Sequence, residues 1–148
     1  MLDANTVPVL VSLLQRGEKG VRKEACWALS NATSGGSAEQ IAYLVGQGVV
    51  YPLAQMLKVD DSRIVMVALE GLENILRSGK VLADAAGGGA NPHLQTMREA
   101  GVDEALLELN HAPANIYNKA VTIHDAYFTG EDITVDDLAA TLAASMLE

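Results

Sequence analysis

The sequence predicts an all-α protein built from a repeated helical unit, and three observations lead to that class. A shift of 43 residues superposes one stretch of the chain on the next without a gap. The superposed residues are mostly apolar and recur at helical spacing. No stretch shows the sustained alternation or the Asn-Gly turn that indicates paired strands. The superposed pairs are Val7 with Val50, Leu10 with Leu53, Leu14 with Leu57, Ala25 with Ala68, Leu29 with Leu72, and Asn31 with Asn74.

Each unit is predicted to contain short helices followed by a longer one. Ser62 is the expected N-cap of the longer helix, because serine accepts backbone hydrogen bonds at that position. Gly79 is the expected C-terminal stop, because glycine commonly ends helices. The predicted helices are residues 39–48, 50–59 and 62–79 in the second unit, and residues 21–36 for the longer helix of the first.

A weaker third copy follows, and an insertion separates it from the second. The glycine run Gly87–Gly89 in that insertion predicts a flexible surface loop. The last residues begin acidic and then become rich in Ala and Leu. The predicted organisation is a partial repeat at 1–36, a repeat at 37–79, a Gly-rich insertion loop at 80–91, a degenerate final repeat at 92–130 and a tail at 131–148.

A period of about 40–47 residues built from two or three helices is typical of armadillo and HEAT repeats. Such units stack into a right-handed superhelical solenoid, because each one buries its apolar face on its neighbours. We expect about three armadillo repeats. Val7 follows Met1 too closely for a leading short helix, so the first repeat is expected to be incomplete and the chain to be a fragment of a longer solenoid.

Composition and charge exclude several classes of protein. The 148 residues are 49% hydrophobic, which is enough apolar surface to fold. Acidic residues outnumber basic ones by 19 to 10, for a net charge of −9. That balance disfavours binding to nucleic acid or anionic lipid and favours basic partners. No apolar run is long enough to predict a membrane span, and neither a metal site nor a cofactor is indicated.

The only tryptophan lies off the predicted core stripe. Trp27 and Asn31 are four residues apart, so they share a helical face, and Glu24 lies one turn before Trp27. An indole face can hold the stem of a lysine or arginine, an amide can bind a peptide backbone, and a carboxylate can neutralise the cation. These three residues, the Trp27 rung, predict a site for a basic extended peptide. The alternative is a core role, since a single tryptophan at helical spacing is most often buried.

The run VRKEACWALSNATSGG resembles the third helix of a repeat in the importin-alpha (karyopherin-alpha) family of nuclear-import adaptors. QIAYLVGQGVVYPLAQML and ALEGLENIL are similar to the next repeat, and IYNKAVTIHDAYF with the acidic GED is similar to the last repeat and the start of the tail. The resemblance covers about residues 5–132 and implies the last three repeats of that family, the first without its leading helix.

The resemblance also implies functional residues and partners. The resemblance implies that Trp27, Asn31 and Glu24 bind basic nuclear localisation signals at one edge of the minor site. It implies weaker contacts for Ser30 and Asn74. The next repeat departs from the pattern, because Glu70 stands where the family has tryptophan. Implied partners are importin-beta in the full-length protein, and an export receptor and nucleoporins at the last repeats. Shuttling between cytoplasm and nucleus is implied as well.

Two functional classes stay open: a nuclear-import adaptor, and an armadillo scaffold for partners in adhesion or signalling. The Trp27 rung is the feature that discriminates between them. An enzyme is not expected, because Cys26 has no nucleophile signature around it. The run Gly87–Gly89 has no following Gly-Lys-Ser/Thr, so it does not predict a phosphate-binding loop.

Overall fold

The computed structural model describes residues 5–129, and the predicted tail at 131–148 lies outside them. Helices make up most of the described chain, and no strand occurs between residues 5 and 129. No helix in this range is long and apolar enough to cross a membrane. The elements are α1 (Thr6–Arg16), α2 (Lys19–Gly35), α3 (Ala38–Gly46), α4 (Val50–Gln55), the short 3-10 helix η1 (Met56–Lys58), α5 (Ser62–Ala85), α6 (Leu94–Glu99), α7 (Val102–Glu108), the 3-10 helix η2 (Leu109–His111) and α8 (Ala114–Tyr127).

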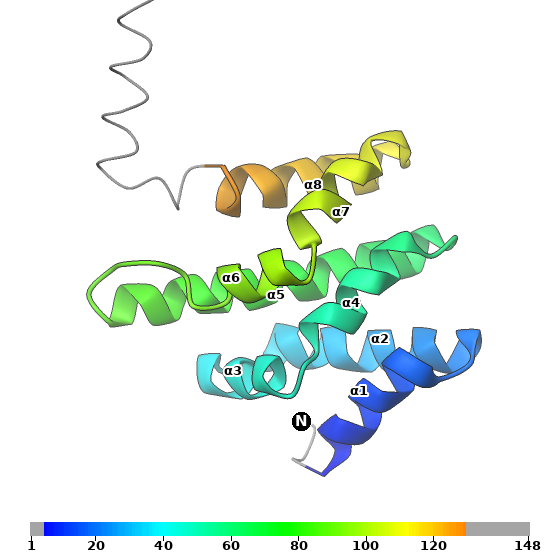
Figure 1. The fold of residues 1–148 in the computed structure, drawn as a ribbon, viewed down its shortest axis with the longest axis horizontal. Coiled ribbons are helices and arrows are strands. Elements are labelled where there is room, and N and C mark those ends of the chain that lie inside the picture. The colour runs from blue at the N-terminus through cyan, green and yellow to red at the C-terminus, as the bar shows by residue number, and fades with distance from the viewer. Residues whose placement is uncertain (1–4, 130–148) are drawn as a thin grey trace, which may run out of the picture.

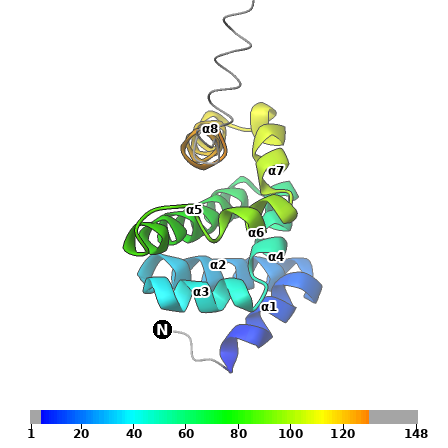
Figure 2. The ribbon, with the colours of Figure 1, turned by 60° about the vertical axis from the view of Figure 1, so that its left-hand side comes forward.

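The long helices stack on one another and form one side of the molecule (Figure 1). Helix α5 packs against α2 on one side and against α8 on the other. Figure 2 shows α2, α5 and α8 in one column, with α1, α4 and α7 in a second column beside them. Repeated units that each pack on the next form an armadillo solenoid. The predicted all-α solenoid is therefore confirmed.

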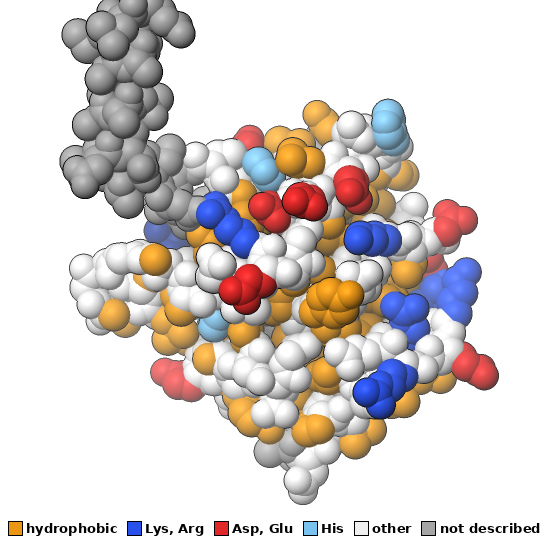
Figure 3. Space-filling model, in the orientation of Figure 1, with side chains coloured by type: hydrophobic (Ala, Val, Ile, Leu, Met, Phe, Trp, Pro, Cys, Tyr) orange, Lys and Arg blue, Asp and Glu red, His pale blue; other side chains and the backbone are white. Residues whose placement is uncertain are grey.

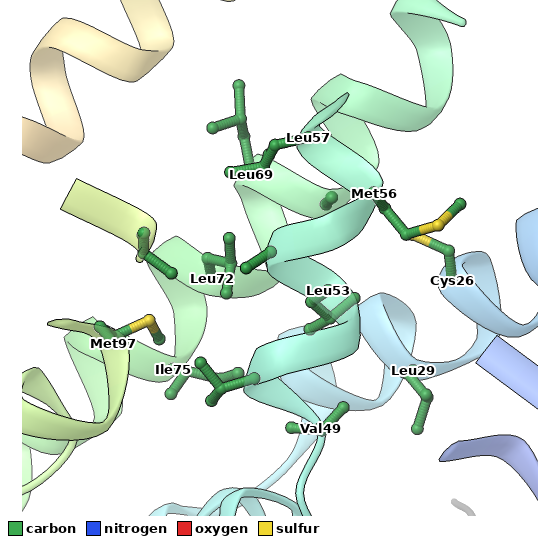
Figure 4. Close-up of a cluster of buried hydrophobic side chains, with 14 of the residues drawn as sticks. Cys26, Leu29, Val49, Leu53, Met56, Leu57, Leu69, Leu72, Ile75 and Met97 are labelled. Carbon is green, nitrogen blue, oxygen red and sulfur yellow. The ribbon is translucent and has the colours of Figure 1, made fainter. Parts of the chain in front are cut away.

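The 43-residue periodicity corresponds to the core of the structure. Figure 4 shows apolar side chains from several helices converging, including Leu29 of α2, Leu53 of α4 and Leu72 of α5. All three are fully buried, as is Met97 of α6. Leu14 and Leu57, another superposed pair, are also buried. The apolar matches recur because each repeat presents the same side chains to its neighbours.

The predicted start of the long helix at Ser62 is confirmed, but its predicted N-cap, Ser62, and its predicted end at Gly79 are wrong. The N-cap is Asp61, whose Oδ1 accepts hydrogen bonds from the backbone nitrogens of Arg63 (3.1 Å) and Ile64 (3.4 Å). At the other end α5 continues six residues past Gly79 to Ala85. The predicted insertion loop at 80–91 therefore begins with helical residues. The loop itself contains Gly87–Gly89, all with positive φ, which favours glycine there.

Gly79 is required by packing and not by helix termination. A Cβ at this position would collide with Oδ1 of Asn91 and lie 3.0 Å from Cδ2 of His93. Asn91 is held there by two hydrogen bonds: its Nδ2 donates to the Leu76 carbonyl at 2.8 Å, and its Oδ1 accepts from the His93 backbone N–H at 3.0 Å. Glycine thus lets the segment that leads into the last repeat lie directly against α5.

Candidate functional site

Helix α2 separates a buried face from an exposed one, and this separation places the Trp27 rung. Ala25, Cys26 and Leu29 are at most 2% exposed and face the core, whereas Trp27 is 41% exposed. Glu24 and Asn31 lie on the same side of the helix as Trp27, away from those core residues. The core alternative for Trp27 is therefore wrong. With 3.6 residues per turn, positions 24, 27 and 31 follow one another along a single stripe of the helix.

Ser30 has a structural role that the sequence did not indicate. It is 6% exposed, and its Oγ donates a hydrogen bond to the Val67 carbonyl of α5 at 2.8 Å. A Cβ at Gly71 would lie only 2.5 Å from that Oγ, so glycine there lets α2 and α5 approach closely. This placement corrects the expectation that Ser30 contacts a peptide, because its hydroxyl faces α5 and already has an acceptor.

Asn74 lies on the partly buried edge of α5, and its amide is engaged at both ends. Its Nδ2 donates to Oγ1 of Thr33 at 3.2 Å, and its Oδ1 accepts from Nη1 of Arg77 at 3.2 Å. One amide hydrogen and one lone pair are left for a ligand. Asn74 is therefore a more constrained candidate than Asn31, and its peptide contact stays a prediction.

The outward faces of α2 and α5 together form one surface, because the two helices run side by side in the same direction. The cross-helix contacts of Thr33 with Asn74 and of Ser30 with Val67 fix this register. Glu70 is exposed on α5 at the position that corresponds to Trp27. We call this surface the ladder face; its residues are Glu24, Trp27, Asn31 and Ser34 of α2 and Glu70, Asn74 and Arg77 of α5.

Ion pairs at and beside the ladder face connect the helices. Lys23 Nζ lies 2.7 Å from Asp61 Oδ2, and the hydrogen bond from Lys23 lowers the pKa of Asp61. Glu73 Oε1 accepts from Lys119 Nζ of α8 at 2.6 Å and lies 3.3 Å from Nη2 of Arg77. The carboxylate of Glu73 therefore joins α5 to the last repeat. Sequence reasoning missed this cluster, although Arg77 stands one helical turn after Asn74.

Neither a nucleophile nor a metal site accompanies the ladder face in the described part of the chain. Burial raises the pKa of the Cys26 thiol to about 12, so the thiolate is strongly disfavoured and the residue packs in the core. Within residues 5–129, no three His, Cys, Asp or Glu side chains gather as metal ligands would. The chemistry that the ladder face presents is a flat indole, amides and charges of both signs, which suits non-covalent recognition.

The overall acidity is distributed unevenly along the chain. All of the basic residues lie within 5–129, whereas about a third of the acidic residues do not. On the face shown in Figure 3, acidic and basic side chains are interspersed among hydrophobic atoms. Within residues 5–129, the carboxylates on the ladder face are those of Glu24 and Glu70. The acidic residues outside the described range are Asp3, Glu131, Asp132, Asp136, Asp137 and Glu148.

The repeat, the stacked helices and the exposed rung define the class of this protein. The sequence pattern of the armadillo/beta-catenin-like repeat matches residues 1–34 and 37–77, and the chain belongs to that family. Among solved structures, it is similar to a designed armadillo repeat protein in complex with the peptide (KR)4. The TM-score is 0.64 and the sequence identity 30%, over 80% of this chain and 45% of that one.

Within the armadillo proteins, the chain is similar to importin subunits alpha, as its sequence motifs indicated. It is 43% identical over 124 residues to importin subunit alpha-5 of Arabidopsis thaliana, which covers 83% of this chain and 24% of the relative. It is 44% identical over 190 residues to importin subunit alpha-1a of Oryza sativa subsp. japonica, covering 98% of this chain and 36% of the relative. The chain thus spans about a quarter to a third of the length of these relatives.

Proposed function

We propose that the chain is part of a nuclear-import adaptor and that the Trp27 rung binds a lysine or arginine of a nuclear localisation signal, at the edge of the minor site. The observation that carries the proposal is the exposed Trp27 on a helix whose other face is fully buried. The names of the relatives, importin subunits alpha, support the import role. The (KR)4 peptide in the complex of a similar designed protein supports the basic character of the ligand.

Each member of the rung has a separate task in this binding. The indole of Trp27 holds the aliphatic stem and faces the cation, which contributes about 0.5–2 kcal/mol depending on desolvation. Asn31 offers a donor and an acceptor to the peptide backbone from the outward side of α2. Glu24, one turn earlier, balances the charge. The binding requires an extended peptide, because a helical one hides its backbone groups in its own hydrogen bonds.

The same ladder face limits how far the peptide extends. Glu70 replaces the aromatic platform at the next position, and the amide of Asn74 is already bonded to Thr33 and Arg77. A second cation could pair with Glu70 but would have no indole to lie on. This chain therefore provides one full rung, and tight binding of a bipartite signal needs further rungs elsewhere in the adaptor.

The last repeat is proposed to serve protein partners other than the signal peptide, namely an export receptor or nucleoporins, while importin-beta acts on the full-length adaptor. Leu107 of α7 is 60% exposed, and Tyr117 and Val121 of α8 are 43% and 39% exposed. These side chains line one shallow apolar pocket between α7 and α8. Apolar surface of this kind is typical of protein contacts. The adaptor would shuttle between cytoplasm and nucleus and needs neither cofactor nor enzymatic step.

The single tryptophan allows a direct test of the rung. Its fluorescence reports on the proposed site, so a Lys/Arg-rich peptide titrated into this chain should change the emission, whereas a peptide with the same length and uncharged side chains should not. Trp27→Phe keeps a smaller ring for an anisotropy assay with a labelled peptide, and Glu24→Gln removes the charge. Both should weaken binding, and Tyr51→Ala, which removes an exposed aromatic side chain from α4, should not.

The outcome separates the two functional classes. Saturable binding that depends on Trp27 and Glu24 supports the import adaptor. A basic peptide that leaves the Trp27 emission unchanged, or that binds equally well to Trp27→Phe, Glu24→Gln and Tyr51→Ala, would contradict the proposal. That result would favour an armadillo scaffold for other partners.

A further inference from the structure

A pocket of about 220 Å³ opens near the Trp27 rung and is lined by residues of α2, α3 and α5. Thr33 and Ser34 line it from α2, and Asn74, Arg77 and Ser78 line it from α5. No acidic residue of the described chain is part of its lining. The Thr33 and Ser34 hydroxyls already donate to the Ser30 and Asn31 carbonyls. The donors that remain for a ligand come from the Asn74 amide, the Arg77 guanidinium and the Ser78 hydroxyl, beside an apolar part of the lining formed by Ala38, Ile41 and Val81.

The guanidinium keeps a net positive charge in spite of its contacts. Arg77 reaches the carboxylate of Glu73 at 3.3 Å, but Lys119 reaches the same Oε1 at 2.6 Å. The single carboxylate of Glu73 neutralises one of these two cations, so the cluster has a net charge of one positive unit. The side chain of Arg77 is 60% exposed, and its bonds to Glu73 and Asn74 leave several of its N–H groups over. These donors are available to a ligand in the pocket.

Ser78 contributes a buried hydroxyl to the pocket. The residue is 7% exposed and lines the pocket, and its Oγ has no hydrogen-bond partner among the described residues. A buried hydroxyl without a partner is unfavourable, and such groups are usually satisfied in proteins. The Oγ is enclosed in this conformation, so a rotation of the Ser78 side chain toward the pocket would let a ligand atom accept its hydrogen bond.

The helical spacing of α2 relates the pocket to the rung. Trp27 lies about one turn before Asn31, and Ser34 lies about one turn after it, so the indole and the pocket are on opposite sides of Asn31. An extended peptide that crosses α2 with its backbone at Asn31 points successive side chains to opposite sides. The residue next to the one on Trp27 is therefore directed toward the pocket.

We propose that this pocket binds an acidic side chain, a carboxylate or a phosphorylated hydroxyl, at the peptide position adjacent to the basic residue held by Trp27. The inference rests on the proposed function and refines its specificity. The preferred peptide carries a cation on Trp27 and an anion at the neighbouring position. Arg77 supplies the charge and Ser78 a hydrogen bond.

The C-terminal end of α2 would by itself favour the opposite polarity. Helix α2 has no basic residue in its last turn, so the negative end of its dipole favours a cation nearby. Arg77 lines the pocket at this end and already is that cation. A lysine of the peptide placed there would be repelled by Arg77, whereas an anion would pair with it.

Labelled peptides with one lysine in an otherwise uncharged sequence test the inference by anisotropy with this chain. The neighbouring position, on either side, carries Ala, Asp, phosphoserine or Lys. We expect Asp to bind about threefold tighter than Ala, the size of an exposed charge pair, and phosphoserine at least as tightly as Asp. Arg77→Glu should reverse the order of Asp and Lys, and Ser78→Ala should reduce the advantage of Asp. Arg63→Glu, an equal charge change on an exposed position in the first turn of α5, is the matched control and should preserve the order.

Each pattern of affinities has a definite meaning. If Asp, Ala and Lys bind wild type equally, or if Lys binds best, the anion pocket is wrong while the Trp27 rung stands. If Arg77→Glu and Arg63→Glu change the preference for Asp over Lys by the same factor, the overall electrostatic field of the protein selects the anion. That result would overturn the inference, because the pocket would have no specific role. If none of the lysine peptides binds or changes the Trp27 emission, the proposed function itself fails and the inference with it. An advantage of phosphoserine without one for Asp would assign the pocket to phosphate alone and overturn its assignment to carboxylates.

Discussion

Replacing Gly79 by alanine should destabilise the protein, although the same change usually stabilises a helix. Gly79 is fully within α5, where alanine is favoured over glycine by about 1 kcal/mol. Here the new methyl group would collide with Asn91 and press on His93. Displacing Asn91 would break its bonds to the Leu76 carbonyl and the His93 N–H, each contributing about 0.5–1.5 kcal/mol.

The net effect follows from these opposing contributions. Two lost hydrogen bonds and the strain of overpacking, about 1–3 kcal/mol, exceed the gain in helix propensity. We expect the free energy of unfolding to fall by about 1–3 kcal/mol, measured as a lower urea midpoint by circular dichroism. Gly20→Ala is the matched control. Gly20 is also helical, a Cβ there meets no atom within 4 Å, and the change should raise stability by about 0.5–1 kcal/mol. Equal effects of the two substitutions would refute the packing of residues 91–93 against α5.

Three further predictions concern the site and the core. Trp27→Ala should weaken binding of a basic signal peptide by about 1–2 kcal/mol in anisotropy titrations, and an unchanged affinity would remove Trp27 from the site. Ser30→Ala should lower the free energy of unfolding by about 1 kcal/mol and leave peptide affinity unaltered, because only its bond to Val67 is lost. Burial lowers the pKa of His93, so stability should be full above about pH 6.5 and decline as the pH falls below it. His93→Gln should flatten that decline in urea melts between about pH 7 and 5, and a decline of the same size in the variant would assign it to other groups.

The stacking of repeats could be predicted in detail, because it depends on features that recur along the chain. A solenoid core is made by the same apolar positions in each unit, so Leu29 and Leu72 identify one another as core residues from the repeat pattern alone. Trp27 is not at one of these recurring apolar positions, so the repeat pattern predicted that it is exposed. The last repeat has fewer matches to the other two, so its core positions are less sharply predicted by the repeat pattern.

The detailed roles of Ser30, Gly79 and Arg77 depend on partners that are distant in sequence. Ser30 donates a hydrogen bond to Val67, and Gly79 leaves the space that Asn91 occupies. Arg77 and Lys119 of the last repeat both form ion pairs with Glu73. Helical periodicity states which face of a helix a residue occupies, but not which atom of another helix lies opposite. Repetition in the sequence thus determined the architecture and the exposed rung. Whether a polar residue on that surface meets a peptide or another helix was decided by how closely α2, α5 and α8 pack, since hydrogen bonds and close contacts form only between atoms that the tertiary structure brings together.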